Sequence, residues 1–196
     1  MLEIKENSIL DMLDMYGEDV CQEILSSFSC PLNKDVEDFI RNKAITFAKQ
    51  RIAITFLVFS NEDGKLIGYY TLVNRFVVVI ENMLSKTIQK KISKFSQYDS
   101  KLHSFLISMP LIAQLGKNFV DNNPISGAEL LELACNRIKY VQRMIGGKTT
   151  YIECNANDKL LNFYSKNQFM TFGERTKENA EFGDNTKLIQ MLRYFK

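Results

Sequence analysis

A turn that leads into an amphipathic helix is the feature of this sequence that most constrains its fold. The segment Asn122–Pro124 consists of residues typical of turns. The chain after it places its apolar residues on one helical face, namely Leu130, Leu131, Ala134, Ile138, Val141 and Ile145. Two glycines, Gly146 and Gly147, then supply a left-handed stop. The pattern predicts a helix that starts near Ser126 and ends before these glycines.

The start of this helix has two interpretations. Ser126 and Glu129 have the spacing of a capping box, in which both side chains satisfy the first N–H groups of the helix. Alternatively, the N–H groups of a helix N-terminus bind a phosphate, and a glycine such as Gly127 allows the close approach that this requires. The two interpretations do not exclude each other, because a cap uses only some of the N–H groups.

Two runs of β-forming residues around a turn indicate a hairpin. Ile54–Phe59 and Lys65–Val73 flank the turn Asn61–Gly64. Gly68, inside the second run, predicts a bulge or a close backbone contact. Further along, His103–Leu115 is long and largely apolar, so it is expected to be a central strand of the sheet.

The remaining segments complete a mixed pattern. Residues 1–50 are expected to be a helical N-terminal part, and a short helix is expected after Asn157. Strands are predicted at Thr149–Cys154, Phe169–Phe172 and Lys187–Tyr194, with a long polar loop, Gly173–Thr186, between the last two. This order predicts an α/β fold (mixed, α+β-like), in which helices flank a central mixed sheet in a single domain, residues 1–196.

Composition narrows the class of protein. The chain has 196 residues, of which 45% are hydrophobic and 24% charged, as in one soluble domain. No run approaches the ~20 apolar residues of a membrane span, and no secretory signal is visible, so a cytoplasmic location and no membrane partner are expected. The four cysteines form no CxxC pair, and His103 is the single histidine, so no metal site is expected. The net charge of +2 disfavours a nucleic-acid partner.

Lysines are concentrated between the hairpin and the long apolar strand. The segment Glu81–Lys101 contains Lys86, Lys90, Lys91, Lys94 and Lys101, with Phe95 and Tyr98 among them. The cluster has two explanations, contact with the phosphates of RNA or a solvated helix face. Acidic residues elsewhere balance the lysines, which favours the solvated face. An RNA-linked role predicts RNA binding that falls steeply with salt.

The motifs that follow the apolar strand resemble those of the GNAT superfamily of acetyl-CoA-dependent N-acetyltransferases, and particularly its compact bacterial and phage-type members. The family motif Q/R-x-x-G-x-G/A precedes a helix with paired leucines; here Gly127 stands at the last glycine, with Leu130 and Leu131 after it. A downstream family motif, Asn-x-x-Ala-x-x-x-Tyr-x-x-x-Gly-Phe, is matched by Asn157, Tyr164 and Phe169. The resemblance covers roughly residues 35–195 and is most specific over 102–169.

The sequence departs from both motifs. Asn122 stands at the Gln/Arg position and Ile125 at the first glycine of the upstream motif. In the downstream motif, Leu160 replaces the alanine and Gln168 replaces the last glycine. The missing first glycine is the specific reason to question the phosphate site.

The resemblance implies an acyl-CoA-binding core in residues 102–169. It implies that the pyrophosphate is held by backbone N–H groups at the helix start and that the end of the apolar strand contacts the pantetheine. The cofactor-binding residues so implied are Ala113, Gln114, Leu115, Asn122, Ser126, Gly127, Ala128 and Asn157. Asn157 has an alternative role as the N-cap of the next helix.

The resemblance also implies direct attack of an amine on acetyl-CoA in a ternary complex. Tyr164 is the candidate general acid for the leaving thiolate, and its alternative role is that of an amphipathic core tyrosine. Glu153 is the candidate general base, or else a structural hydrogen-bond acceptor. His103 is better explained as a surface residue and Cys154 as a buried thiol.

Two classes of function follow from these expectations. The first is an N-acetyltransferase that moves an acetyl group from acetyl-CoA to a primary amine of a small molecule, peptide or protein, without a metal. The second is a non-catalytic GNAT-fold module that binds acyl-CoA or a regulatory partner, and the departures at Asn122, Ile125 and Gln168 keep it open. An exposed edge beside the last strands would allow a homodimer.

Overall fold

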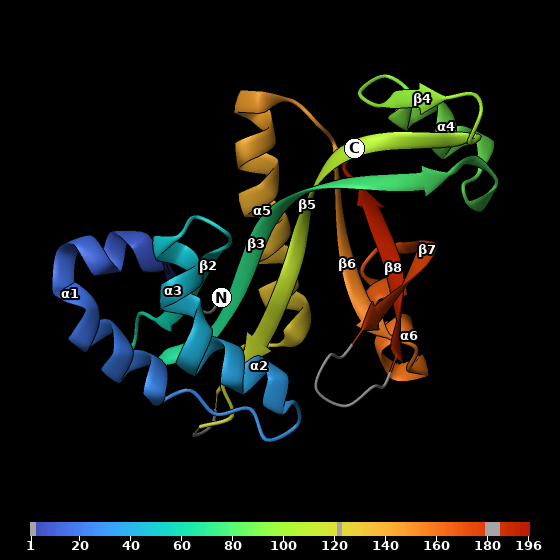
Figure 1. Cartoon of the computed structure of the whole chain (residues 1–196). Coiled ribbons are helices and arrows are strands. Elements are labelled where there is room, and N and C mark those ends of the chain that lie inside the picture. The colour runs from blue at the N-terminus through green and yellow to red at the C-terminus, as the bar shows by residue number, and fades with distance from the viewer. Residues whose placement is uncertain (1–2, 121–122, 179–184) are drawn as a thin grey trace. The chain divides into compact units, whose positions relative to one another are not determined.

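The fold is described by a computed structural model that covers residues 3–120, 123–178 and 185–196 (Figure 1). The chain divides into two compact units. Unit 1 consists of Met1–Val73 and Ile112–Arg137, and unit 2 of Asn74–Leu111 and Ile138–Lys196. Two strands and one helix pass from one unit to the other, so each unit is assembled from distant parts of the sequence.

Unit 1 contains a hairpin with an additional strand at its edge. Its elements are β1 (Ile4–Ser8), α1 (Ile9–Ser26), α2 (Lys34–Asp38), the π-helical turn η1 (Phe39–Lys43), α3 (Ala44–Lys49), β2 (Ile54–Ser60), the first part of β3 (Leu66–Ile80), the end of β5 (Ser104–Lys117) and the first part of α5 (Gly127–Ile145). The strands are hydrogen-bonded in the order β1-β2-β3-β5. The predicted hairpin is confirmed, and the register shift beside Gly68 is the bulge that this glycine predicts.

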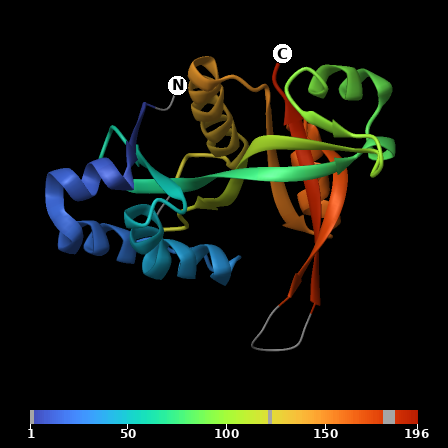
Figure 2. The same cartoon turned by 45° about the horizontal axis from the view of Figure 1, so that its top comes forward.

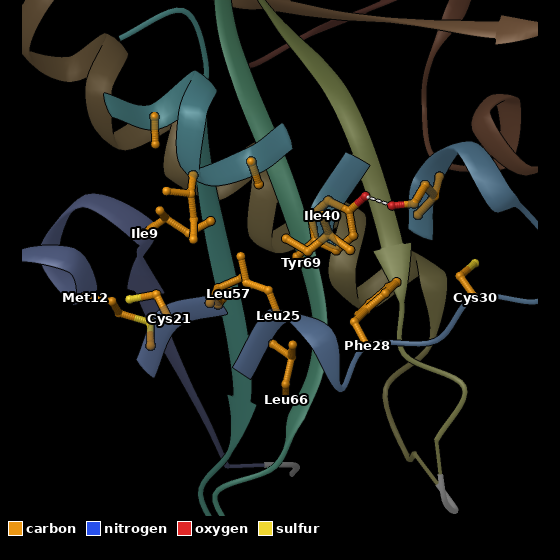
Figure 3. Close-up of a cluster of buried hydrophobic side chains, with 14 residues drawn as sticks. Ile9, Met12, Cys21, Leu25, Phe28, Cys30, Ile40, Leu57, Leu66 and Tyr69 are labelled. Carbon is orange, nitrogen blue, oxygen red and sulfur yellow. Dashed lines mark hydrogen bonds between the residues drawn. The ribbon is translucent and has the colours of Figure 1, made fainter. Parts of the chain in front are cut away.

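The helices α1 to α3 bury one face of the unit 1 strands (Figure 3). Leu57 and Tyr69 point from the hairpin into a cluster that includes Ile9, Leu25 and Ile40, all with 1% or less of their surface exposed. Alternation along the strands sends every second side chain to this face. Gly17, at φ +80°, interrupts α1.

Strand β1 is an element that the sequence analysis missed. It pairs antiparallel with β2, from Ile4 opposite Ser60 to Ser8 opposite Phe56, so the N-terminal part is not purely helical as expected. On the other face of the strands, the buried Tyr70 donates a hydrogen bond to Glu6 of β1, and Arg137 of α5 lies 3.7 Å from the same carboxylate. This polar contact joins an edge strand of only five residues to the rest of unit 1.

Unit 2 is built on a mixed sheet. Its elements are the rest of β3, η2 (Glu81–Met83), α4 (Lys86–Ile92), β4 (Gln97–Asp99), the first part of β5, the end of α5, β6 (Thr149–Asn155), α6 (Asp158–Lys166), β7 (Met170–Glu178) and β8 (Asn185–Tyr194). The strand order is β3-β5-β6-β8-β7, with β4 paired to β5. The pairing of β5 with β6 is parallel, and β6, β8 and β7 are antiparallel neighbours.

The core of unit 2 lies between the sheet and α4. Val77, Val79, Ile107 and Met109 of the strands pack with buried residues of the α4 segment, namely Leu84, Ile88 and Ile92. Figure 2 shows α4, in green, over the end of β3 and the start of β5. The predicted bounds of the loop Gly173–Thr186 are wrong, because β7 continues to Glu178 and β8 begins at Asn185. Its polar residues pair across a long antiparallel ribbon, which a search for apolar alternation does not detect.

Strand β5 pairs in parallel with β6 inside unit 2, where Leu111 lies opposite Tyr151. Beside this pair the hydroxyl of Thr150 donates to the carbonyl of Pro110 at 2.9 Å. None of the described helices is long and apolar enough to span a bilayer.

Candidate acetyl-CoA site

The N-terminus of α5 forms the predicted capping box. The backbone N–H of Ser126 donates to the Glu129 carboxylate at 2.8 Å, and the Glu129 N–H donates to the Ser126 hydroxyl at 3.2 Å. The hydrogen bonds from Ser126 hold the pKa of Glu129 below its usual range, and Lys117 adds a smaller effect in the same direction. An ionised carboxylate therefore occupies the helix start, where the helix dipole favours negative charge.

Gly127 and Ala128 retain the groups that a phosphate would use. Their N–H groups make no hydrogen bond within the described residues, because the capping box engages Ser126 and Glu129 instead. Lys117 lies at the end of β5 and donates from Nζ to the Asn123 carbonyl at 3.0 Å. These groups fit a pyrophosphate if the Glu129 side chain rotates away, since its charge would otherwise repel the anion. The Ser126 N–H becomes available by the same rotation.

Two asparagines fix the loop that leads to this helix. Asn118 is 4% exposed and accepts hydrogen bonds from the N–H groups of Ser29, at 2.9 Å, and Val120, at 3.3 Å, while it donates to the Leu66 carbonyl at 2.8 Å. Asn123 donates to the carbonyls of Ile67 and Asn118. The loop is therefore tied to the hairpin and to the end of α1. The cofactor position predicted at Asn122 lies outside the described residues.

Ile125, which replaces the first glycine of the motif, is buried in unit 1. Its exposed fraction is 1%, and its N–H donates to the side-chain oxygen of Asn123 at 3.0 Å. The isoleucine therefore anchors the loop from inside, where a glycine could not.

The end of β5 presents an accessible stretch of backbone. Ala113 is exposed, and Gln114 and Leu115 are half-buried. The backbone of an extended strand can pair with the amides of an extended ligand. The pantetheine contact expected at Ala113, Gln114 and Leu115 stays a prediction.

Tyr164 of α6 lies in an aromatic environment in unit 2. Its ring makes edge contacts with Phe163, at 5.0 Å between centroids, and Phe169, at 5.8 Å. Burial raises the pKa of Tyr164, and the nearby Cys154 adds to this effect. Within the described residues its hydroxyl makes no hydrogen bond. The phenol is therefore protonated at neutral pH and has a proton to donate to a ligand.

Asn157 and Glu153 both have structural partners. The side chain of Asn157 accepts from the N–H groups of Lys159, at 2.9 Å, and Leu160, at 3.4 Å, and so caps α6. One oxygen of Glu153 accepts from Arg175 at 2.8 Å, and the other accepts from Gln190 at 2.9 Å. These contacts match the structural alternatives for both residues. Glu153 can act as a base only after it loses a strong charge-assisted hydrogen bond.

Gln168 stands at the last glycine position of the downstream motif, and its backbone has a conformation that favours glycine. Its φ is +69°, in the left-handed region where glycine is favoured. It follows the last turn of α6, where its N–H donates to the Ser165 carbonyl at 3.0 Å and that of Phe169 donates to Tyr164 at 3.0 Å. Glycine would adopt this conformation without steric strain, whereas this chain holds a glutamine side chain there.

We expect Gln168→Gly to stabilise the protein by about 1 kcal/mol, because a non-glycine residue in the left-handed region costs about 1–2 kcal/mol and the added freedom of glycine in the unfolded chain returns part of the gain. Urea denaturation measures the free energy of unfolding. Gln168→Ala is the matched control and should bring no gain, since alanine meets the same steric penalty. Equal stability of the glycine variant and the wild type would contradict the prediction.

The other reactive side chains do not form a site. Among the described residues no group of three His, Cys, Asp or Glu side chains could hold a metal ion. The four cysteines are buried and form no disulfide within the described residues, and desolvation raises the pKa of Cys21, Cys30 and Cys154. His103 is exposed and precedes β5, as expected of a surface residue.

The distribution of charge is a feature that the sequence analysis missed. Unit 1 contains 9 lysines and arginines against 15 aspartates and glutamates, a net charge of −6. Unit 2 contains 16 against 8, a net charge of +8. The overall +2 is therefore the sum of two strongly charged units. Counted by unit, charge no longer disfavours a nucleic-acid partner for unit 2.

A central sheet with flanking helices is the mixed α/β fold of GNAT type that the sequence predicted. No protein-family model matches the chain, and no curated protein matches it in sequence. Solved structures do match. AtaT complexed with acetyl-methionyl-tRNAfMet is 20% identical, with a TM-score of 0.65 over 95% of this chain and 94% of that one.

Two further solved structures support the same fold. A tyrosine-to-phenylalanine mutant of KacT is 17% identical, with a TM-score of 0.63 over 95% of both chains. A tyrosine-to-phenylalanine mutant of the AtaT toxin, bound to the C-terminus of the antitoxin AtaR and to acetyl-CoA, is 14% identical, with a TM-score of 0.57 over 95% of this chain and 93% of that one. At these identities the likeness establishes the fold.

Proposed function

We propose that this protein is an N-acetyltransferase that moves the acetyl group of acetyl-CoA to the α-amine of an aminoacyl-tRNA. The fold, shared with an AtaT structure that holds acetyl-methionyl-tRNAfMet, supports acetyl transfer. An RNA acceptor is inferred from the net charge of +8 in unit 2, because phosphate contacts dominate the affinity of proteins for RNA.

The residues of unit 1 would bind the acyl donor. The N–H groups of Gly127 and Ala128, with that of Ser126 once Glu129 moves, would receive the pyrophosphate, and Lys117 would balance its charge. The backbone of Ala113, Gln114 and Leu115 would pair with the amides of the pantetheine and polarise the thioester carbonyl. Asn122 belongs to the same loop in the sequence. When bound, acetyl-CoA supplies an activated acyl group.

In the transfer step the amine nitrogen forms a bond to the acetyl carbon and the carbon–sulfur bond breaks. Tyr164 donates its proton to the leaving sulfur, and the amine loses one proton to the solvent. The free hydroxyl and the protonated state of Tyr164 support this role. Asn157 acts by capping the helix that carries Tyr164.

The state of Glu153 favours an α-amine over a lysine side chain as the acceptor. Both oxygens of this carboxylate are engaged, so it is poorly placed to remove a proton. An α-amine has a pKa of about 7.7–8.0, and roughly one molecule in four is neutral near pH 7.4. A lysine amine, with a pKa of about 10.4, is neutral in roughly one molecule in a thousand and depends far more on a base.

A second candidate is a non-catalytic module with the same fold. The capping box favours it, because Glu129 holds negative charge where the pyrophosphate would bind. Thermal shift with acetyl-CoA, dephospho-CoA and buffer separates binding of the cofactor from no binding, and thiol release in the presence of an amine then separates an enzyme from a module that only binds. A ligand present at about 100 times its Kd stabilises a protein by about 2.7 kcal/mol. No shift with saturating acetyl-CoA would exclude the enzyme.

The acceptor is tested with radiolabelled acetyl-CoA and a mixture of aminoacyl-tRNAs. We expect label in the RNA fraction that is released by base hydrolysis of the aminoacyl ester. The same tRNA with its α-amine already acetylated is the matched control and should stay unlabelled. If peptides are labelled and aminoacyl-tRNA is not, the protein is an acetyltransferase with a different acceptor, and the tRNA proposal fails.

A further inference from the structure

A cleft of about 540 Å³ lies in unit 2, in the segment that connects β3 to β5. Its lining combines apolar side chains, amides, one carboxylate, one lysine and one imidazole: Ile80, Glu81, Asn82, Leu84, Lys86, Gln89 and His103. None of these residues has a role in the site described above. The cleft is large enough for one nucleotide, and its lining offers both an apolar surface and hydrogen-bonding groups.

The rim of the cleft carries exposed side chains with flat or apolar surfaces. Tyr98 is 47% exposed, its hydroxyl donates to Glu81 at 2.6 Å, and its ring contacts Phe105 at 4.9 Å between centroids. His103 lies beside it, with Nδ1 at 3.4 Å from the Tyr98 hydroxyl. Leu102 is 66% exposed and Met83 49%. The ring of Tyr98 is thus held from within while part of it remains open to solvent.

The backbone of His103 is also unusual, because its φ is +46°, a conformation that costs a non-glycine residue free energy. Its carbonyl accepts from the Glu81 N–H at 2.9 Å, which closes the base of the segment. The fold therefore holds the histidine in a strained turn at the edge of the cleft. Strain of this kind is often found at binding sites.

The carboxylate of Glu81 lines the cleft. Because it is paired, it repels an anionic ligand less strongly than an unpaired carboxylate would. The hydrogen bond from Tyr98 holds the pKa of Glu81 low, with Lys86 and His103 adding smaller effects. Lys86 lies 3.6 Å from this carboxylate and is otherwise almost fully exposed. A paired carboxylate of this kind can accept a hydrogen bond from the amino group of a base, as acidic side chains do in base recognition.

The lysines continue along one side of this segment. Lys86 and Lys90 are one helical turn apart on α4, and Lys94 follows the end of the helix. Lys90 and Lys94 are exposed and make no ion pair within the described residues. Three cationic side chains at a spacing of four residues can contact successive phosphates of a nucleic-acid backbone.

We propose that this cleft binds one unstacked nucleotide of the RNA acceptor, with the base against Tyr98 and His103 and the adjoining phosphates on Lys86, Lys90 and Lys94. The inference rests on the proposed function, and it adds a contact site that is separate in sequence from the acyl-donor residues. Exposed aromatic rings beside lysines suit single-stranded RNA, because every base offers a face for stacking. An acidic peptide would use the lysines and leave the rings without a role.

The first test measures the affinity of a fluorescently labelled, unacylated tRNA by anisotropy between about 50 and 200 mM salt. We expect Lys86→Gln/Lys90→Gln/Lys94→Gln to reduce the slope of log affinity against log salt by about 2 to 3, since each lost phosphate contact contributes about 0.7 to 0.9. The matched control is Lys49→Gln/Lys5→Gln/Lys34→Gln in unit 1. It removes the same charge and also contains one ion-paired lysine, because Lys49 pairs with Glu18.

The second test separates the base from the phosphates. Tyr98→Ala should weaken tRNA binding about tenfold at constant salt and leave the slope unchanged, because stacking does not release counterions. Tyr98→Phe keeps the ring and should bind within about twofold of the wild type. Melting curves show whether Tyr98→Ala has disturbed the contact with Phe105; if it has, the comparison is made with Tyr98→Leu.

The outcomes distinguish this inference from the proposed function. A smaller slope for Lys86→Gln/Lys90→Gln/Lys94→Gln, together with an unchanged slope for Tyr98→Ala, supports the cleft. Tight tRNA binding that neither variant changes relative to the control overturns the cleft and leaves the proposed acceptor standing. No binding of tRNA by the wild type at the lowest salt overturns both the cleft and the proposed acceptor. If the cleft variants lose binding of an acidic peptide and keep binding of tRNA, the surface is a contact site for a protein.

Discussion

Replacing Tyr164 with phenylalanine is expected to lower the rate of acetyl transfer about 10²- to 10⁴-fold, the usual contribution of a positioned general acid or base. The ring contacts with Phe163 and Phe169 do not involve the hydroxyl, so the packing of α6 should survive the change. The lost group is the proton donor for the leaving thiolate. Release of free thiol from acetyl-CoA in the presence of the acceptor measures the rate.

Tyr151→Phe is the matched control for this variant. Tyr151 is a buried tyrosine of the same unit, and burial raises its pKa to about 12, yet we assign it no role in transfer. Its variant should transfer acetyl groups within about twofold of the wild-type rate. Binding of acetyl-CoA by Tyr164→Phe should be unchanged. A Tyr164→Phe enzyme with the wild-type rate would remove Tyr164 from the mechanism.

The pH dependence follows from the direction of the Tyr164 shift. A raised pKa keeps the phenol protonated at and somewhat above the ordinary tyrosine value of about 10. Ionisation of Tyr164 should therefore not lower the rate between about pH 6 and 9, where the neutral fraction of the acceptor amine should control it instead. Rates should rise with pH through the pKa of the amine and then level off.

Replacing Gly116 with alanine is expected to destabilise the protein by about 3 kcal/mol, at the upper end of the usual cost of overpacking a core. A Cβ at this position would lie 2.5 Å from the ring of Tyr69, 2.7 Å from Val36 and 3.0 Å from Phe28. Tyr69 is fully buried and donates to the Val36 carbonyl at 2.6 Å, so its ring cannot move without breaking that hydrogen bond.

Gly173→Ala is the control for this prediction. Gly173 also lies in a strand, and the atom that its added Cβ would approach, at 3.0 Å, is the end of the flexible Gln190 side chain. Its cost should stay below about 1 kcal/mol. Urea denaturation with a common m-value compares the two variants with the wild type. A loss of less than about 1 kcal/mol for Gly116→Ala would show that the core of unit 1 is looser than these distances indicate.

Local features of the fold could be predicted because their causes are local. The hairpin, the amphipathic helix and the capping box depend on neighbouring residues, and all three are present. Strand β1 could not be predicted in the same way. Its short polar sequence becomes a strand only because β2 offers a free edge and Tyr70 and Arg137 contact Glu6, and these partners are far away along the chain.

The same distinction applies to the candidate site, because some of its features follow from local spacing and others depend on distant residues. The motif residues Gly127, Asn157 and Tyr164 and the altered glycine position at Gln168 could be located from the sequence, because motifs preserve spacing. Whether Glu153 was a base or a structural acceptor depended on Arg175 and Gln190, which β7 and β8 bring to it. No spacing rule contains that information, since antiparallel pairing joins residues at any separation.

The helix after Asn122–Pro124 shows how the two sources of information combine. The sequence by itself determined that a helix begins there and that Ser126 and Glu129 can cap it. The tertiary structure decided that the cap closes and that Asn118 and Asn123 tie the loop to the hairpin. It also decided that the modest net charge of the chain separates into an acidic and a basic unit. Charge is a property of composition, but its field depends on which residues fold together.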